Sequence, residues 1–179
     1  MSYTKKQIAA FQDILAWCPP DKSAPVVHRA TIDDKFVVTD GSVCVILNER
    51  PEELLMDDNG QFFYDFCKAE IDNGDHELAK GSVSVADCKA VIRQWKEQVR
   101  KKVPGTPDKP RIQVSGKVSA QFDARKVLNA LTAIGPSARV YIGRRVRGHS
   151  HLYTPSPSLI VSNWEVTTSY AVILPLRTS

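Results

Sequence analysis

The sequence lacks the long apolar runs and the paired cysteine motifs that mark several protein classes. No run approaches the ~18 apolar residues that a membrane-spanning helix needs. The cysteines are scattered along the chain, without CxxC pairing or the neighbouring histidines of a zinc site. We therefore predict no membrane association, no bound metal, no cofactor, and buried free thiols in a reducing cytosol. The four cysteines are Cys18, Cys44, Cys67 and Cys88.

Catalytic signatures are also missing. There is no phosphate-cradling glycine loop, no HExxH, no GxSxG, and no acid cluster with the spacing of a two-metal nuclease. The paired carboxylates Asp33-Asp34 and Asp57-Asp58 are explained by turn chemistry. These absences favour a binding protein over an enzyme. A small nucleic-acid enzyme, with a site that one sequence does not reveal, is the less favoured alternative.

The beginning of the chain resembles a signal peptide only superficially. Lys5-Lys6 precede an apolar stretch, but Gln12 and Asp13 interrupt it and no small-residue cleavage site follows. We predict no targeting segment and a cytoplasmic protein. A chain of 179 residues suits one domain, since ~100 to 200 residues per domain is typical.

Charge is divided unevenly along the chain. The formal net charge is only +4, but acidic residues dominate from Glu49 to Glu77, where Arg50 and Lys68 are the basic residues. From Leu78 onward basic residues outnumber acidic ones. Clustered cations suit a surface that binds polyanions, because counterion release from phosphates rewards them. An ordinary solvated surface is the alternative.

One basic cluster lies on a helix that we predict near residues 86 to 102, capped by Ser84 or Asp87. An apolar stripe at helical spacing should pack against the core, and a cationic stripe lies beside it. The apolar stripe is Cys88, Ile92, Trp95 and Val99, and the basic one is Lys89, Arg93, Lys96 and Arg100. Turn-by-turn cations suit phosphate tracking, although a solubilising helix face fits equally well.

The last third of the chain predicts a strand, a helix and an antiparallel meander. Residues 117–122 alternate polar and apolar, and the helix from Asp123 to Ile134 carries two more candidate nucleic-acid contacts, Arg125 and Lys126. Asp123 is its expected N-cap, and Gly135-Pro136 should stop it. The extended candidates that follow are residues 139–143, 150–154, 158–162 and 169–174.

A second basic cluster lies between two of these strands, where we predict a hairpin tip. Arg144, Arg145 and Arg147 on such a loop could clamp phosphates or enter a groove. His149 and His151 could bind a metal, but no third ligand is near, and an exposed polar loop explains them better.

The middle of the chain is less informative. Asn59-Gly60 is a good tight-turn signal, and the aromatic residues within 61–71 should pack against the core. Residues 103–110 contain three prolines (Pro104, Pro107 and Pro110) and predict a linker. No internal repeat is strong enough to use.

The order of these elements resembles a domain of the bacterial DNA sliding clamp. The residues that carry the resemblance are Phe122, Val127-Leu128-Asn129-Ala130-Leu131 and Leu174-Pro175-Leu176-Arg177. A fainter match near the start includes a helix face on Ile8, Phe11, Ile14 and Leu15, followed by Val37-Val38-Thr39-Asp40-Gly41. The two matches cover residues 3–48 and 111–177. The resemblance implies an α+β fold, with the helices near 4–16 and 123–134 packed on one curved antiparallel sheet.

We therefore predict a single clamp-like domain over residues 1–179, with an insertion at about 49–110 that carries the extra basic helix. The implied function is a non-catalytic accessory protein, of phage or mobile-element origin, that binds DNA through the basic helices and loop. The alternative is a module that binds or mimics a replication or repair protein. By resemblance, Leu174, Pro175 and Leu176 would then line a peptide groove. The oligomeric state stays open, because a ring would need several copies.

Overall fold

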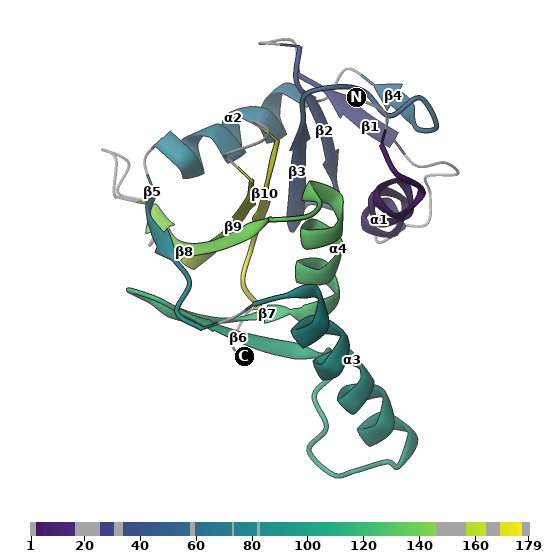
Figure 1. Cartoon of the computed structure of the whole chain (residues 1–179), viewed down its shortest axis with the longest axis vertical. Coiled ribbons are helices and arrows are strands. Elements are labelled where there is room, and N and C mark those ends of the chain that lie inside the picture. The colour runs from purple at the N-terminus through teal and green to yellow at the C-terminus, as the bar shows by residue number, and fades with distance from the viewer. Residues whose placement is uncertain are drawn as a thin grey trace.

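The computed structural model describes residues 3–16, 26–30, 34–57, 60–72, 74–81, 83–145, 157–163 and 169–176. Over these residues the chain is α+β, with four helices, one large sheet and one small hairpin (Figure 1). The α+β class predicted from the sequence is confirmed.

The large sheet has eight strands in the order β4-β1-β2-β3-β10-β9-β8-β5. All neighbours are antiparallel except β1 and β4, which run parallel. The strands are β1 (Val26–Arg29), β2 (Phe36–Thr39), β3 (Val43–Leu47), β4 (Leu55–Asp57), β5 (Gly74–Leu78), β8 (Arg139–Arg145), β9 (Pro157–Ser162) and β10 (Tyr170–Ile173). A separate hairpin consists of β6 (Arg111–Ser115) and β7 (Ser119–Asp123).

The centre of the sheet contains an internal repeat that the sequence did not reveal. Helix α1 (Lys5–Leu15) precedes the antiparallel run β1-β2-β3, and helix α4 (Ala124–Ile134) precedes the antiparallel run β8-β9-β10. The last strands of the two runs, β3 and β10, pair antiparallel in the middle. An approximate two-fold axis through this pair therefore relates the two halves.

The two helices of the repeat lie together on one face of the sheet. They contact each other, α1 contacts β2, and α4 contacts β3, β9 and β10. The side-chain Nε2 of Gln7 on α1 donates a hydrogen bond to the backbone carbonyl of Ala133 on α4, at 2.9 Å. The prediction that both helices pack on one antiparallel sheet is confirmed.

Both helix starts follow from their capping residues. Thr4 accepts a hydrogen bond from the Gln7 amide N–H, and the Gln7 side chain bonds back, which completes a capping box. Asp123 caps α4 by accepting from the Arg125 amide N–H. The predicted stop also holds, because Gly135 ends α4 with a φ of 100°, which favours glycine.

Helix α2 (Gly60–Asp72) covers the opposite face of the sheet. Side chains alternate between the two faces along each central strand. Val43, Val45 and Leu47 face α1 and α4, whereas Cys44 and Ile46 face α2. Each face of the central strands therefore has its own apolar core.

Helix α2 corrects one prediction about the middle of the chain and agrees with another. Gly60 begins a helix, although Asn59-Gly60 indicated a tight turn. The expected packing of the aromatic segment holds for Tyr64, which is buried against the sheet. The segment expected as an insertion, about 49–110, thus supplies β4, α2, β5 and the basic helix.

The other sequence predictions can be placed on this frame. The strands expected at 139–143, 158–162 and 169–174 are β8, β9 and β10, whereas 150–154 lies outside the described residues. Cys44, Cys67 and Cys88 are buried and free, as expected, and Cys18 lies outside the described residues. Burial raises the pKa of the Cys88 thiol to about 12, so it stays protonated at neutral pH.

Candidate nucleic-acid interface

The basic helix α3 (Val85–Arg100) begins at a second capping box, which uses both predicted capping residues. Ser84 Oγ accepts from the Asp87 amide N–H at 3.2 Å, and Asp87 Oδ2 accepts from the Ser84 amide N–H at 2.8 Å. The helix ends at Arg100, slightly before the predicted end. Residues 101–110 then return the chain to β6, as the prolines indicated.

The apolar stripe of α3 packs against the body only over its first half. Cys88 is fully buried, Ile92 and Trp95 are half-buried, and Val99 is 48% exposed. Figure 1 shows the reason, since the end of α3 extends beyond the sheet and the other helices. The prediction that the whole stripe packs is therefore wrong at Val99. The helix is a projecting arm whose base is fixed by α4.

Four cations follow one side of this arm, and we call Lys89, Arg93, Lys96 and Arg100 the basic stripe. All four side chains are exposed, and within the described residues none forms an ion pair. Together with Ile92, Glu97 and Leu128 they line a depression of about 470 Å³. The structure thus brings the predicted α3 cations together around one concavity, to which α4 contributes Leu128.

Arg125, on α4, forms contacts within the fold and does not belong to the basic stripe. Its guanidinium forms two hydrogen bonds with the carboxylate of Asp123, at 3.0 and 2.7 Å, and Asp123 is buried. The same guanidinium lies 5.6 Å from the centre of the Trp95 ring. Trp95 Nε1 in turn donates to the carbonyl of Pro107, at 2.8 Å. Arg125 therefore braces α3 and its return loop against the start of α4.

Lys126 is also turned inward. Its ammonium lies 2.9 Å from Asp40 Oδ2 and also contacts Ser42 Oγ. Asp40 sits in the Thr39-Asp40-Gly41 turn, where its Oδ1 accepts from the amide groups of Ser42 and Val43, both at 2.8 Å. This ion pair joins α4 to the turn between β2 and β3.

The titration of Asp40 reflects these partners. Burial alone would raise the pKa of Asp40, but the Lys126 ammonium and the amide groups of Val43 and Ser42 outweigh burial. They hold the pKa of this carboxyl below its usual value. Asp40 is therefore ionised at neutral pH, and the charge of Lys126 is compensated within the fold.

The predicted basic loop is only partly described. Arg144 is exposed on β8, the side chain of Arg145 is outside the described residues, and so is all of Arg147. His149 and His151 also lie outside them. Figure 1 places the end of β8 on the opposite side of the molecule from the tip of α3, so Arg144 does not extend the basic stripe.

The segment Leu174, Pro175 and Leu176 connects the two sheets. The Leu174 amide donates to the carbonyl of Ser42, at 2.9 Å, and the Leu176 amide donates to the carbonyl of Gln121 on β7, at 2.8 Å. The strand β10 ends before Pro175, and the backbone amides on both sides of the proline are hydrogen-bonded to neighbouring segments. All three side chains are half-buried. The peptide groove stays a prediction.

No family model, curated protein or solved structure matches the chain. Within the described residues no three histidine, cysteine or acidic side chains gather as a metal-binding group. In the same part of the chain, no helix combines the length and the apolar character needed to cross a bilayer.

One polar trio was not anticipated. Ser158 Oγ donates to Glu70 Oε2 at 2.8 Å and lies 2.7 Å from His76 Nε2. Because the hydroxyl proton is used on Glu70, Ser158 accepts from His76, the reverse of a nucleophilic serine arrangement. Ser158 is only 1% exposed, and burial lowers the pKa of His76. The trio ties α2, β5 and β9 together.

Sequence reasoning also missed the apolar part of the depression. Ile92 was assigned to a core-facing helix stripe, and both Ile92 and Leu128 do pack against the main core. Their half-burial leaves the remaining surface facing the basic stripe. No local pattern could reveal this, because the depression forms only where α3 meets α4.

Proposed function

We propose that the chain is a non-catalytic, DNA-associated accessory protein with a sliding-clamp-like domain, and that the basic stripe of α3 is its nucleic-acid contact. The observation that carries the proposal is the group of exposed cations Lys89, Arg93, Lys96 and Arg100 around one depression. Like charges at three- and four-residue spacing repel each other within the helix. Such a group gains most when a polyanion neutralises it.

The geometry of the stripe supports this contact. A rise of 1.5 Å per residue spreads the four cations over about 16 Å along the helix axis. All four side chains are exposed, and the second half of α3 extends beyond the sheet and the other helices (Figure 1), so a long polymer can reach this side of α3 without a clash with the sheet. Phosphate contacts of this kind position a protein without reading sequence. The expected binding is sequence-independent and sensitive to salt.

The clamp-like part of the proposal is supported by the way the two matching segments pack together. The two segments that carry the resemblance, 3–48 and 111–177, supply the two related halves of the large sheet and both helices on one face. The Thr39-Asp40-Gly41 turn of the first segment is joined to α4 of the second through Lys126. The two matches therefore belong to one structural unit.

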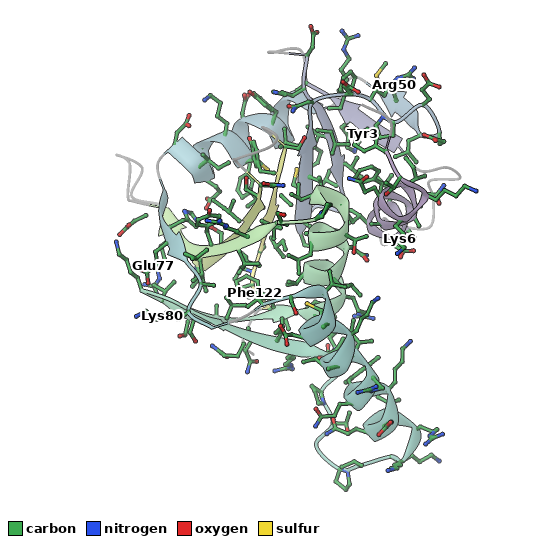
Figure 2. The ribbon with its side chains drawn as sticks, viewed as in Figure 1. Tyr3, Lys6, Arg50, Glu77, Lys80 and Phe122 are labelled. Atoms are coloured by element: carbon green, nitrogen blue, oxygen red, sulfur yellow. The ribbon has the colours of Figure 1, made fainter. Side chains whose placement is uncertain are left out.

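The test is the salt dependence of binding to a fluorescent DNA duplex, measured by anisotropy. Each of the four substitutions Lys89→Gln, Arg93→Gln, Lys96→Gln and Arg100→Gln should lower the slope of log K against log salt by about 0.9. Lys80→Gln is the matched control, because Lys80 is exposed and lies far from the tip of α3 (Figure 2).

Two results would contradict the proposal. The first is an absence of DNA binding by the wild type at low salt. The second is an equal loss of slope in Lys80→Gln, which would show that overall charge and not the stripe attracts DNA. An unchanged far-ultraviolet circular dichroism spectrum for each variant confirms that the fold is intact.

A further inference from the structure

The depression beside α3 has a chemical feature that phosphate binding does not use. Its rim carries the basic stripe, but the two helices also expose the aliphatic side chains of Ile92 and Leu128 within it. Both side chains are half-buried and packed against the main core, so neither is free to turn away. A sugar-phosphate backbone is polar and gains nothing from an aliphatic surface.

Nucleotide bases do not explain this surface well either. Single-stranded nucleic acids are held by aromatic side chains on which bases stack. The residues that line the depression are Lys89, Ile92, Arg93, Lys96, Glu97, Arg100 and Leu128, and none is aromatic. Trp95 is occupied on another side of α3, where it contacts Arg125 and Pro107. The aliphatic pair therefore matches an apolar side chain better than a base.

We propose that this depression binds a short acidic peptide segment of a partner protein, with one large apolar side chain seated on Ile92 and Leu128 and carboxylates paired with the basic stripe. The peptide would compete with nucleic acid for the same cations. The competition rests on the proposed function, whereas the peptide binding does not.

The size and rigidity of the depression fit such a ligand. A volume of about 470 Å³ lies within the range of ligand-binding pockets, about 300 to 1,000 Å³. An extended peptide advances about 3.3 Å per residue, so five or six residues span the ~16 Å of the stripe. The brace of Arg125, Trp95 and Pro107 fixes α3 against α4, so the walls are formed before the ligand arrives.

Glu97 makes the charge along the rim of the depression uneven. It lines the depression among the four cations, so a ligand carboxylate is attracted along most of the rim and repelled beside Glu97. A peptide with an apolar or neutral residue next to Glu97 is therefore favoured over a uniformly acidic one. The site should therefore prefer a peptide with such a gap in its negative charge over a polyanion, such as DNA, whose charge is uniform along its length.

The experiment compares two labelled peptides of equal charge by fluorescence anisotropy with the full chain. The probe is Asp-Asp-Phe-Leu-Asp-Asp, and the control is Asp-Asp-Ser-Ser-Asp-Asp. The probe should bind at least about tenfold more tightly, because only it places an apolar group on the aliphatic surface. Equal affinities would overturn the proposal, since charge alone would then explain binding.

Variants locate the site. Leu128→Ala should remove most of the difference between the two peptides, and Arg93→Gln should weaken both. If Leu128→Ala does not fold, Glu97→Gln serves instead, because it lies on the exposed rim and should tighten both peptides. If the probe binds more tightly than the control but its affinity is unchanged in Arg93→Gln and in Glu97→Gln, it binds elsewhere on the protein. That result would defeat the proposal.

Displacement of a labelled duplex by unlabelled probe peptide then tests the competition. Displacement by the probe at lower concentrations than by the control supports both the peptide site and the proposed function. Selective peptide binding by a protein that binds no DNA defeats the proposed function and the competition, and leaves the peptide site supported. DNA binding without peptide selectivity defeats the peptide site alone.

Discussion

The cations of α3 and those of α4 have the same charge and the same helical setting, but opposite surroundings. The basic stripe is exposed around a depression, whereas Arg125 and Lys126 are paired with the buried carboxylates of Asp123 and Asp40. The difference arises from the supporting elements. Helix α4 is enclosed by α1, α3 and the sheet, and α3 leaves the body after its first half. Cations that look equivalent in sequence therefore divide into structural and available ones.

The largest effect should come from Lys126. Removing it leaves the carboxylate of Asp40, which is 2% exposed, without its cationic partner. We expect Lys126→Met to lower the free energy of unfolding by about 2 to 3 kcal/mol, less than a fully buried pair because Lys126 is itself partly exposed. Urea denaturation at neutral pH measures this. Lys89→Met is the control, and an equal loss in both variants would remove the distinction between the two groups.

Replacing Arg125 should cause the second largest loss of stability, because a positive charge alone does not reproduce its contacts. A lysine keeps the positive charge but cannot form both hydrogen bonds to Asp123 while lying over Trp95. We expect Arg125→Lys to destabilise the protein by about 1 to 2 kcal/mol. Trp95 fluorescence should shift as well, because its cationic neighbour moves. Wild-type stability in Arg125→Lys would mean that the brace is not needed.

The pH dependence of stability tests the ion pair of Asp40 and Lys126 without replacing Lys126. The pKa of folded Asp40 lies below its unfolded value of about 3.9. Ionised Asp40 therefore stabilises the fold above that pH, and the contribution is lost as the pH falls through the lower, folded pKa. The stability difference between wild type and Asp40→Asn should be constant near neutrality and shrink in acid. A difference that grows below pH 4 would contradict this assignment.

The smallest effect on stability should be a gain, and it should come from replacing Lys96. Lys96 lies three residues after Arg93 and four before Arg100, so like charges surround it on the helix. We expect Lys96→Gln to stabilise the protein by about 0.2 to 0.5 kcal/mol while it weakens DNA binding. Thermal unfolding at low salt measures the gain, which should vanish at high salt. A loss of stability would place Lys96 among the structural cations.

The sequence predicted the elements whose causes are local. Ser84 and Asp123 cap helices through hydrogen bonds to residues two or three positions away, and spacing alone indicates such pairs. The strands β8, β9 and β10 were expected for the same reason, because alternation and turn residues lie within each segment. Helix α2 was missed because its start at Gly60 looked like a turn and its adjacent aromatic residues obscure the helical period.

The candidate site divides in the same way. The basic stripe could be found from its spacing, since all four cations lie on one helix. The inward orientation of Lys126 could not, because its partner Asp40 belongs to a turn in the other half of the chain. The internal repeat was equally hidden, because the two halves share an order of elements and a burial pattern but few residues at matching positions.

The antiparallel pair of β3 and β10 should form later in folding than the local strand pairs on either side of it. It joins residues 43–47 to residues 170–173, and closing so long a loop costs more entropy than closing either local run of strands. Contacts of such separation slow folding. During synthesis, α1 and the first three strands leave the ribosome before β10, so β3 pairs with β2 on one edge while its other edge has no partner. The seam between the two halves then closes only when β10 has emerged.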